Sequence, residues 1–248
     1  MTDFLTDAQR DVQGLAREFA AGEIAPRSAE WNWRHEVPVE LFRQMGDLGL
    51  LGIAVPEEYG GTDLDHVSYC LAVEAIAVAD AGVSTGVAAH TGLAIPPLVR
   101  WGTDAQKGRW LPALVAGETI GAYALSEAEA GSDPASMRMS AKAIERGYVL
   151  DGAKQWITNA GIASFFVVFA RTGEPGPRGI SAFGIEPGLG LRVGAEIEKM
   201  GQHSSSTAEI AFEQMEAPVE ALLGGEGEGL ELALATLGAV SYTHLRAH

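Results

Sequence analysis

The sequence changes from helical to strand-like at residues 119–133, which read TIGAYALSEAEAGSD. Within this stretch a β-rich run at residues 120–125 leads into a loop of small, acidic and hydroxyl-bearing residues. Apolar residues before it recur at helical spacing, whereas short β-rich runs separated by turn signals follow it. The sequence therefore predicts an α+β protein in which a helical region precedes a sheet.

Residues 1–119 are predicted to form an N-terminal all-α domain. Thr6 and Gln9 fit a capping box, in which each side chain accepts a hydrogen bond from the backbone N–H group of the other at the start of a helix. Residues 66–80, HVSYCLAVEAIAVAD, are apolar almost all round, which is typical of a helix that is buried on most sides.

Residues 120–226 are predicted to form a middle domain, an antiparallel β-barrel, because many short strands at regular spacing indicate that architecture. The predicted strands are 120–125, 147–152, 154–158, 165–171, 180–186 and 207–213. Helical spacing resumes at residues 227–240. The last eight residues, 241–248, break the apolar pattern before them and resemble translated adapter sequence, so we expect them to be a non-native tail.

The composition excludes several classes of function. The chain has 17 Lys and Arg against 33 Asp and Glu, a formal net charge of −16, so we expect neither nucleic acid nor an anionic membrane as its main partner. The single cysteine, Cys70, excludes an intramolecular disulfide and a cysteine-based zinc site, and we expect no metal. With no apolar run long enough to span a membrane and no secretory signal, we expect a cytoplasmic protein.

Two stretches carry residue types suited to a planar, anionic ligand. In the loop after residues 120–125, exposed N–H groups can meet carbonyls, ring nitrogens or phosphates, and Gly131 lets the backbone come close. Alternation along a strand places Trp156 and Thr158 on one face, where an aromatic ring and a hydroxyl suit a heterocycle. The alternatives are an ordinary strand-to-loop turn and a core tryptophan with a threonine neighbour.

Five motifs together resemble the acyl-CoA dehydrogenases, a family of flavin-dependent enzymes. They are PEEYGG at 56–61, YALSEAEAGSD at 123–133, KQWITNAG at 154–161, KMGQHSSST at 199–207 and GEGLELAL at 227–234. With the helix–barrel–helix order they cover nearly all of residues 1–240. The ISAF and SSSTAEIAFE segments are most similar to short- and medium-chain members of the family.

The resemblance implies FAD as the cofactor and gives particular residues roles in binding it. Ser126 would form a hydrogen bond near the pyrimidine edge of the isoalloxazine. Ser132 would lie by the pyrophosphate of the flavin and by the pantetheine arm of the acyl thioester. Trp156 would cover one face of the flavin, and Thr158 would reach N5. The predicted cofactor-binding residues are Tyr123, Ala124, Leu125, Ser126, Gly131, Ser132, Trp156, Ile157 and Thr158, and Ser132 is also the predicted substrate-binding residue.

The resemblance further implies that the full-length protein is an oxidoreductase of fatty-acid β-oxidation. It would convert an acyl-CoA thioester to the trans-2-enoyl-CoA with hydride transfer to flavin N5. Electron-transferring flavoprotein would accept the electrons, and the protein would be a homotetramer. The family's catalytic glutamate lies in a C-terminal all-α domain, of which residues 227–240 would be only the first helix. We therefore expect the general base beyond residue 248 and an inactive fragment.

Two other functions stay open at this point. One is an acyl-CoA oxidase or nitroalkane-oxidase-like flavoenzyme of the same family, and the other is a non-catalytic scaffold that binds acyl thioesters. The chain also departs from the family at Ala128 and Glu129, where the usual residues are proline and glycine. Proline and glycine shape a turn, and Glu129 adds negative charge near the expected phosphates, so the loop geometry or the identity of the anionic ligand stays open.

Overall fold

The computed structural model describes residues 4–245, with side chains for residues 4–238, and groups the chain into two compact units. The helical unit comprises Met1–Ala88, Pro112–Glu118 and Glu198–Ser205. The sheet unit comprises Ala89–Leu111, Thr119–Ile197 and Ser206–His248. This spatial grouping does not follow the order of the chain, so the domain limits at residues 119 and 226 stay predictions.

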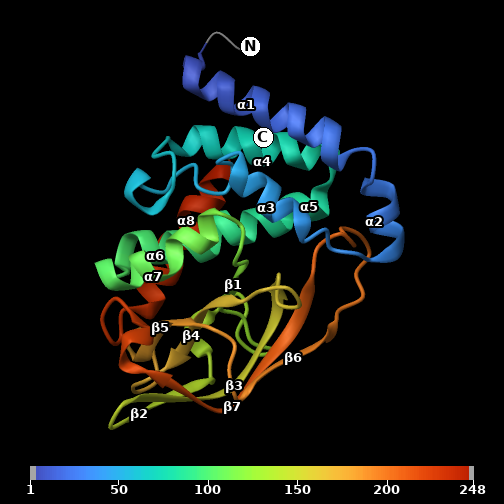
Figure 1. The fold of residues 1–248 in the computed structure, drawn as a ribbon. Helices are drawn as coiled ribbons and strands as arrows, with labels where there is room; N and C mark the ends of the chain where they lie inside the picture. The colour runs from blue at the N-terminus through green and yellow to red at the C-terminus, as the bar shows by residue number, and fades with distance from the viewer. Residues whose placement is uncertain (1–3, 246–248) are drawn as a thin grey trace. The chain divides into compact units, whose positions relative to one another are not determined.

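The helical unit is built from amphipathic and apolar helices. The predicted capping box is confirmed, because Gln9 N donates to Thr6 Oγ1 at 3.2 Å and Thr6 N donates to Gln9 Oε1 at 2.9 Å. The apolar helix at residues 66–79 buries one face only, since the side chain of Val78 on it is 85% exposed. The α-helices are α1 (Asp7–Phe19), α2 (Ser28–Arg34), α3 (Glu40–Asp47), α4 (His66–Ala79) and α5 (Ala81–Ala88), and α7 (Asp104–Val115) belongs partly to each unit (Figure 1).

A buried carboxylate, Asp80, joins several parts of the helical unit. It accepts hydrogen bonds from Ser28 Oγ at 2.5 Å, Asn32 Nδ2 at 2.7 Å and Val83 N at 2.9 Å. Ser204 Oγ, from the segment at residues 198–205, donates to it at 2.5 Å. Burial alone would raise the pKa of Asp80, but hydrogen bonds, chiefly from Ser204 and Ser28, lower it below the ordinary value.

Among the residues that the structure describes, the sheet unit holds eight strands and two further α-helices. The strands are β1 (Gly121–Ala124), β2 (Ser140–Ile144), β3 (Gly147–Thr158), β4 (Phe165–Arg171), β5 (Ile180–Ile185), β6 (Leu191–Glu196), β7 (Thr207–Pro218) and β8 (Leu222–Leu223). The helices are α6 (Ile95–Trp101) and α8 (Gly229–Leu245), and α8 packs on β5 (Figure 1). Helix α8 thus continues into the expected tail at 241–248, of which residues 246–248 lie outside the described residues.

The sheet is open and mixed, which corrects the predicted antiparallel barrel. Its order is β6-β7-β3-β2-β4-β5-β8, with β1 paired to β4, and within the described residues the path does not close (Figure 1). Strand β1 runs parallel to β4, and β2 meets β4 only at Ser140 and Arg171. Strands β1 and β5 are buried throughout, so they read as continuous apolar runs that do not reveal strand direction.

The predicted strand set is also incomplete. Residues 147–152 and 154–158 form one strand, β3, which is bulged against β7. Strands β2, β6 and β8 lie outside the predicted set, because β8 is two residues long and most residues of β2 and β6 are exposed. A strand that buries little apolar surface lacks the pattern from which strands are recognised. The helix–sheet–helix order itself is confirmed.

The core of the sheet unit is formed mainly by buried side chains of its strands. Its large members include Phe166, Phe183 and Phe212, each at most 2% exposed. Removing a fully buried phenylalanine of this kind typically costs about 3–5 kcal/mol. No helix among the described residues has the length and apolarity needed to cross a membrane.

Candidate functional site

The structure brings the segment that follows β1 directly against β3. Gln155 N donates to the carbonyl oxygen of Ser126 at 2.9 Å. Lys154 Nζ donates to the carbonyl oxygen of Leu125 at 3.0 Å. The two predicted ligand-binding stretches are therefore neighbours within the sheet unit, although they are about thirty residues apart in sequence.

Trp156 lies on a bulge in β3 and faces outward. The pairing of β3 with β7 shifts register between Lys154 and Ile157, and Trp156 has a φ of 62°. A bulky residue in the left-handed region is strained, and such strain concentrates at functional sites. The Trp156 side chain is 58% exposed, so it is not the core tryptophan of the alternative interpretation.

The residues on either side of Ile157 share the accessible side of β3. Ile157 is 2% exposed and packs in the core, whereas Trp156 is exposed and Thr158 is half-buried. The arrangement agrees with Trp156 and Thr158 facing the same way. Ile157 can reach a ligand on that side only through its backbone.

The three predicted site residues at the end of β1 are buried. Tyr123, Ala124 and Leu125 are each at most 8% exposed, so their backbone is what a surface ligand could meet. Tyr123 Oη donates to the carbonyl oxygen of Ala233 at 3.3 Å. Burial raises the pKa of Tyr123 far above its usual value, so the phenol stays protonated.

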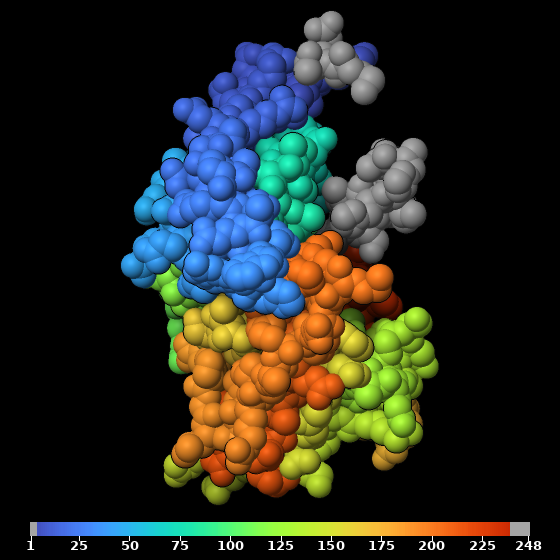
Figure 2. All heavy atoms as spheres, turned by 90° about the vertical axis from the view of Figure 1, so that its right-hand side faces the viewer, coloured from blue at the N-terminus to red at the C-terminus, as the bar shows by residue number. Residues whose placement is uncertain are grey.

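The loop after Leu125 presents hydroxyl groups at the surface. Within the described part of the chain, the hydroxyls of Ser126 and Ser132 on this loop, and of Thr158 on β3, make no hydrogen bond to the protein. Gly131 is exposed, and apart from its own chain neighbours no atom of the described residues lies within 4 Å of where its Cβ would be. The loop, lime green in Figure 2, lies on the surface of the sheet unit. Its donors and its glycine are thus open to a ligand.

The departure at Ala128 and Glu129 does not prevent a tight turn. Glu127 and Ala130 exchange backbone hydrogen bonds of 3.0 and 3.2 Å around these two residues. Neither of the two has a positive φ, so neither position requires glycine. Glu129 also pairs with Arg138 at 3.0 Å, which offsets part of its charge although both side chains are exposed.

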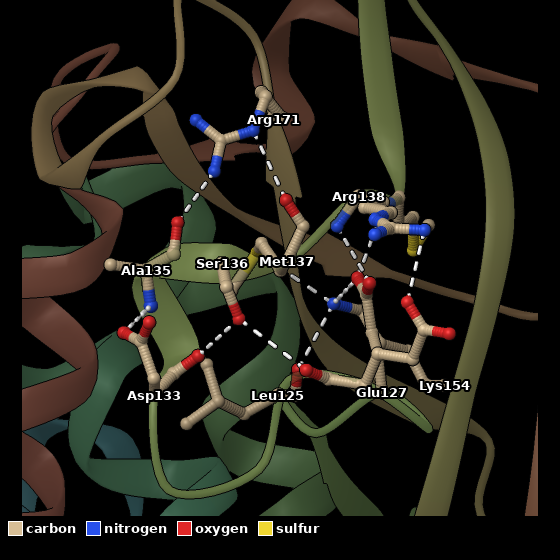
Figure 3. Close-up of polar contacts among 11 residues, drawn as sticks. Leu125, Glu127, Asp133, Ala135, Ser136, Met137, Arg138, Lys154 and Arg171 are labelled. Atoms are coloured by element: carbon tan, nitrogen blue, oxygen red, sulfur yellow. Dashed lines mark hydrogen bonds and ion pairs between the residues drawn. The ribbon is translucent and has the colours of Figure 1, made fainter.

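A buried ion pair that the sequence pattern does not predict supports the loop. Lys154 Nζ lies 2.8 Å from Glu127 Oε1, and the Lys154 side chain is fully buried (Figure 3). Burial lowers the pKa of Lys154 to about 8, although Glu127 opposes the shift. Glu127 also accepts hydrogen bonds from Arg138 N at 2.6 Å and Met139 N at 3.0 Å. The sequence pattern does not reveal this pair, because its two members are 27 residues apart and Lys154 stands beside the polar Gln155.

Arg171 of β4 holds the other end of the loop. Its guanidinium donates to the carbonyl oxygens of Ala135 at 2.8 Å and Met137 at 3.1 Å (Figure 3). The loop is therefore fixed by charged side chains at both ends. Among the described residues, no group of three or more His, Cys, Asp or Glu is placed to hold a metal ion.

Two family models match most of the chain: the acyl-CoA dehydrogenase N-terminal domain at residues 6–118 and the acyl-CoA dehydrogenase middle domain at residues 122–215. The chain belongs to the acyl-CoA dehydrogenase family. The resemblance carried by the five sequence motifs is thereby confirmed.

Individual acyl-CoA dehydrogenases are similar over nearly the whole chain. Mitochondrial isovaleryl-CoA dehydrogenase of Solanum tuberosum is 41% identical, over 93% of this chain and 57% of its own length. The structure of butyryl-CoA dehydrogenase from Megasphaera elsdenii superposes with a TM-score of 0.93 at 38% identity, over 98% of this chain and 65% of that one. An acyl-CoA dehydrogenase of Bacillus anthracis complexed with FAD superposes with a TM-score of 0.92 at 35% identity, over 98% of this chain and 42% of that one.

The chain spans about three fifths of the length of the curated relatives it matches, 57% of the potato protein and 62% of an acyl-CoA dehydrogenase of Bacillus subtilis. The family assignment therefore covers its N-terminal and middle domains.

Proposed function

We propose that this chain forms the FAD-binding part of an acyl-CoA dehydrogenase that oxidises an acyl-CoA thioester to the trans-2-enoyl-CoA. The observation that carries the proposal is the hydrogen bond from Gln155 N to the carbonyl oxygen of Ser126, which sets the loop after β1 beside the part of β3 that carries the exposed Trp156. An aromatic face next to free hydroxyl donors matches a flat heterocycle that bears carbonyl groups.

The residues present fit FAD. Trp156 offers an uncovered ring at a strained backbone position, and no protein atom occupies the space over Gly131. Trp156 would stack on the ring system, Ser126 and Thr158 would donate hydrogen bonds to its polar edge, and Ser132 would bind the pyrophosphate. Bound FAD supplies the two-electron redox chemistry of the reaction.

The contribution of this chain to the reaction is positioning. Trp156 would shield one face of the ring from water, and the hydroxyl donors would fix its orientation. Ser132 would also hold the pantetheine arm of the thioester, which aligns the reacting carbons. Such alignment can supply several orders of magnitude in rate. Glu127 is engaged with Lys154 and two backbone amides, so it is not free to act as the general base.

Our proposals for the general base, the electron acceptor and the assembly state rest on the family resemblance. We place the base beyond residue 248, in the kind of C-terminal helical domain that the family carries. Electron-transferring flavoprotein would take the electrons, and the complete protein would be a cytoplasmic homotetramer of fatty-acid β-oxidation.

The test is Trp156→Ala in the whole gene product, with Trp33→Ala as the matched control. Trp33 lies on α2 and is 81% exposed, so its removal also deletes an exposed indole. We expect Trp156→Ala to lower FAD affinity at least about ten-fold and to change the visible flavin spectrum. Trp33→Ala should change neither.

Three results would contradict parts of this proposal. Normal flavin content and spectrum in Trp156→Ala would remove the stacking role. Rapid oxygen consumption without an acceptor protein would favour the oxidase. A colourless wild-type protein that still binds acyl-CoA would favour the scaffold.

A further inference from the structure

We propose that Lys154 is a positioning residue: held in place by Glu127, it orients the Leu125–Ser126 peptide so that the N–H group of Ser126 faces an acceptor atom of the bound ligand. The inference rests on the proposed function, because the ligand expected at Ser126 is the carbonyl-bearing edge of a flavin. It gives a role to the buried ammonium of Lys154, which is not among the residues proposed to contact FAD.

The orientation follows from the geometry of a trans peptide. Lys154 Nζ donates to the carbonyl oxygen of Leu125 at 3.0 Å, and the described chain has no cis peptide bond. The C=O and N–H groups of a trans peptide point in opposite directions. The N–H group of Ser126 therefore points away from the buried ammonium. Within the described part of the chain, it donates to no protein acceptor.

The neighbouring peptide is held in the same manner. Gln155 N donates to the carbonyl oxygen of Ser126 at 2.9 Å, so both carbonyls at this corner are engaged within the protein. Because the carbonyl oxygens of Leu125 and Ser126 are already hydrogen-bonded, the backbone at this corner offers N–H donors to a ligand and not carbonyl acceptors. A ligand rich in carbonyl and ring-nitrogen acceptors is the chemical match.

The charge of Lys154 adds to the orientation. Hydrogen bonds from an ionised donor are roughly twice as strong as neutral ones, and they polarise the peptide they bind. The Ser126 N–H group thereby becomes a stronger donor. Glu127 keeps the ammonium compensated, and through the amides of Arg138 and Met139 it ties the corner to the start of β2 (Figure 3).

Stability alone is a weak explanation for this pair. Desolvating two charges largely cancels their attraction, and replacing a buried pair by apolar residues is often neutral or stabilising. A lysine whose ammonium bonds a carbonyl at the ligand-facing corner is better explained by the orientation of that peptide. The two explanations predict different behaviour when both charges are removed.

The experiment compares Lys154→Met, Glu127→Gln and the double variant in the whole gene product. Lys142→Met is the control, because Lys142 is an exposed lysine of β2. FAD affinity, the flavin spectrum, melting temperature and hydrogen exchange of the Ser126 amide are measured for each. We expect Lys154→Met to lower FAD affinity at least about ten-fold and to shift the spectrum. The double variant should recover the melting temperature lost by the single variants but not the affinity.

Two results would overturn the positioning role. One is wild-type FAD affinity in the double variant, and the other is affinity that follows melting temperature across all variants. If the wild-type protein binds no FAD, the proposed function fails. Amide hydrogen exchange in the ligand-free protein then tests separately whether Lys154 orients the Leu125–Ser126 peptide. Altered exchange at Ser126 in Lys154→Met would then support the orientation by Lys154, and unaltered exchange would overturn it.

Discussion

At the scale of single residues, the backbone of Trp156 is the most unusual feature of the site. Its φ of 62° lies in a region that L-residues with large side chains avoid. Non-glycine residues there cost about 1–2 kcal/mol relative to the right-handed region. The bulge in β3 therefore keeps the ring outward at a cost that the rest of the sheet must offset.

This strain predicts an unusual order of stability for two variants. Trp156→Gly should unfold with a free energy about 1 kcal/mol higher than Trp156→Ala, because only glycine adopts the left-handed conformation without penalty. Urea unfolding of the two variants measures the difference. The reverse order, which is normal for an extended strand, would show that the bulge relaxes once the ring is removed.

Lys154 predicts an alkaline pH dependence of stability. Burial lowers its pKa from 10.5 to about 8 against the opposing effect of Glu127, so between these values the unfolded chain binds more protons than the folded one. The free energy of unfolding contributed by this group therefore rises with pH over that range. In urea unfolding from pH 7 to 10, the free energy of unfolding of the wild type should rise relative to that of Lys154→Met. A constant difference over this range would contradict the shift.

At the scale of elements, Asp80 links α2, α5 and the segment at residues 198–205. Hydrogen bonds lower its pKa below 3.8, so its contribution to stability is present above that value and is lost as pH falls through the folded pKa. Asp80→Asn should cost about 1–3 kcal/mol near pH 6. The cost should shrink below pH 4.

The control for this prediction is Asp47→Asn, because Asp47 lies exposed at the end of α3. Urea unfolding at several pH values compares the two variants with wild type. Asp47→Asn should stay within about 0.5 kcal/mol of wild type. A cost for Asp80→Asn that is independent of pH would show that the amide fills the role of the carboxylate.

The sequence predicts elements well where local chemistry decides them. The capping box at Thr6 depends on residues three apart, and the strand at 165–171 is a run of buried apolar residues, so both were found. The outward turn of Trp156 and the burial of Lys154 depend on a bulge that forms against β7. Lys154 also depends on Glu127, 27 residues before it, and alternation within one strand shows none of these distant partners.

At the scale of the whole molecule, the five motifs identify the family, but they do not predict which segments of the chain group into each compact unit. The five motifs suffice because each preserves residue types at fixed spacing. The topology is harder to predict, because the parallel pairing of β1 with β4 leaves no trace in two buried runs. The segment at residues 198–205 joins the helical unit through contacts such as that of Ser204 with Asp80.

That contact has a consequence for biosynthesis. The helices made first by the ribosome depend on a hydroxyl that is translated only after most of the strands. A nascent chain that stalls before Ser204 would leave the carboxylate of Asp80 without one of its donors. The amino-terminal helices are thus expected to acquire their final resistance to proteases late in translation, when the strands between residues 120 and 197 have already emerged.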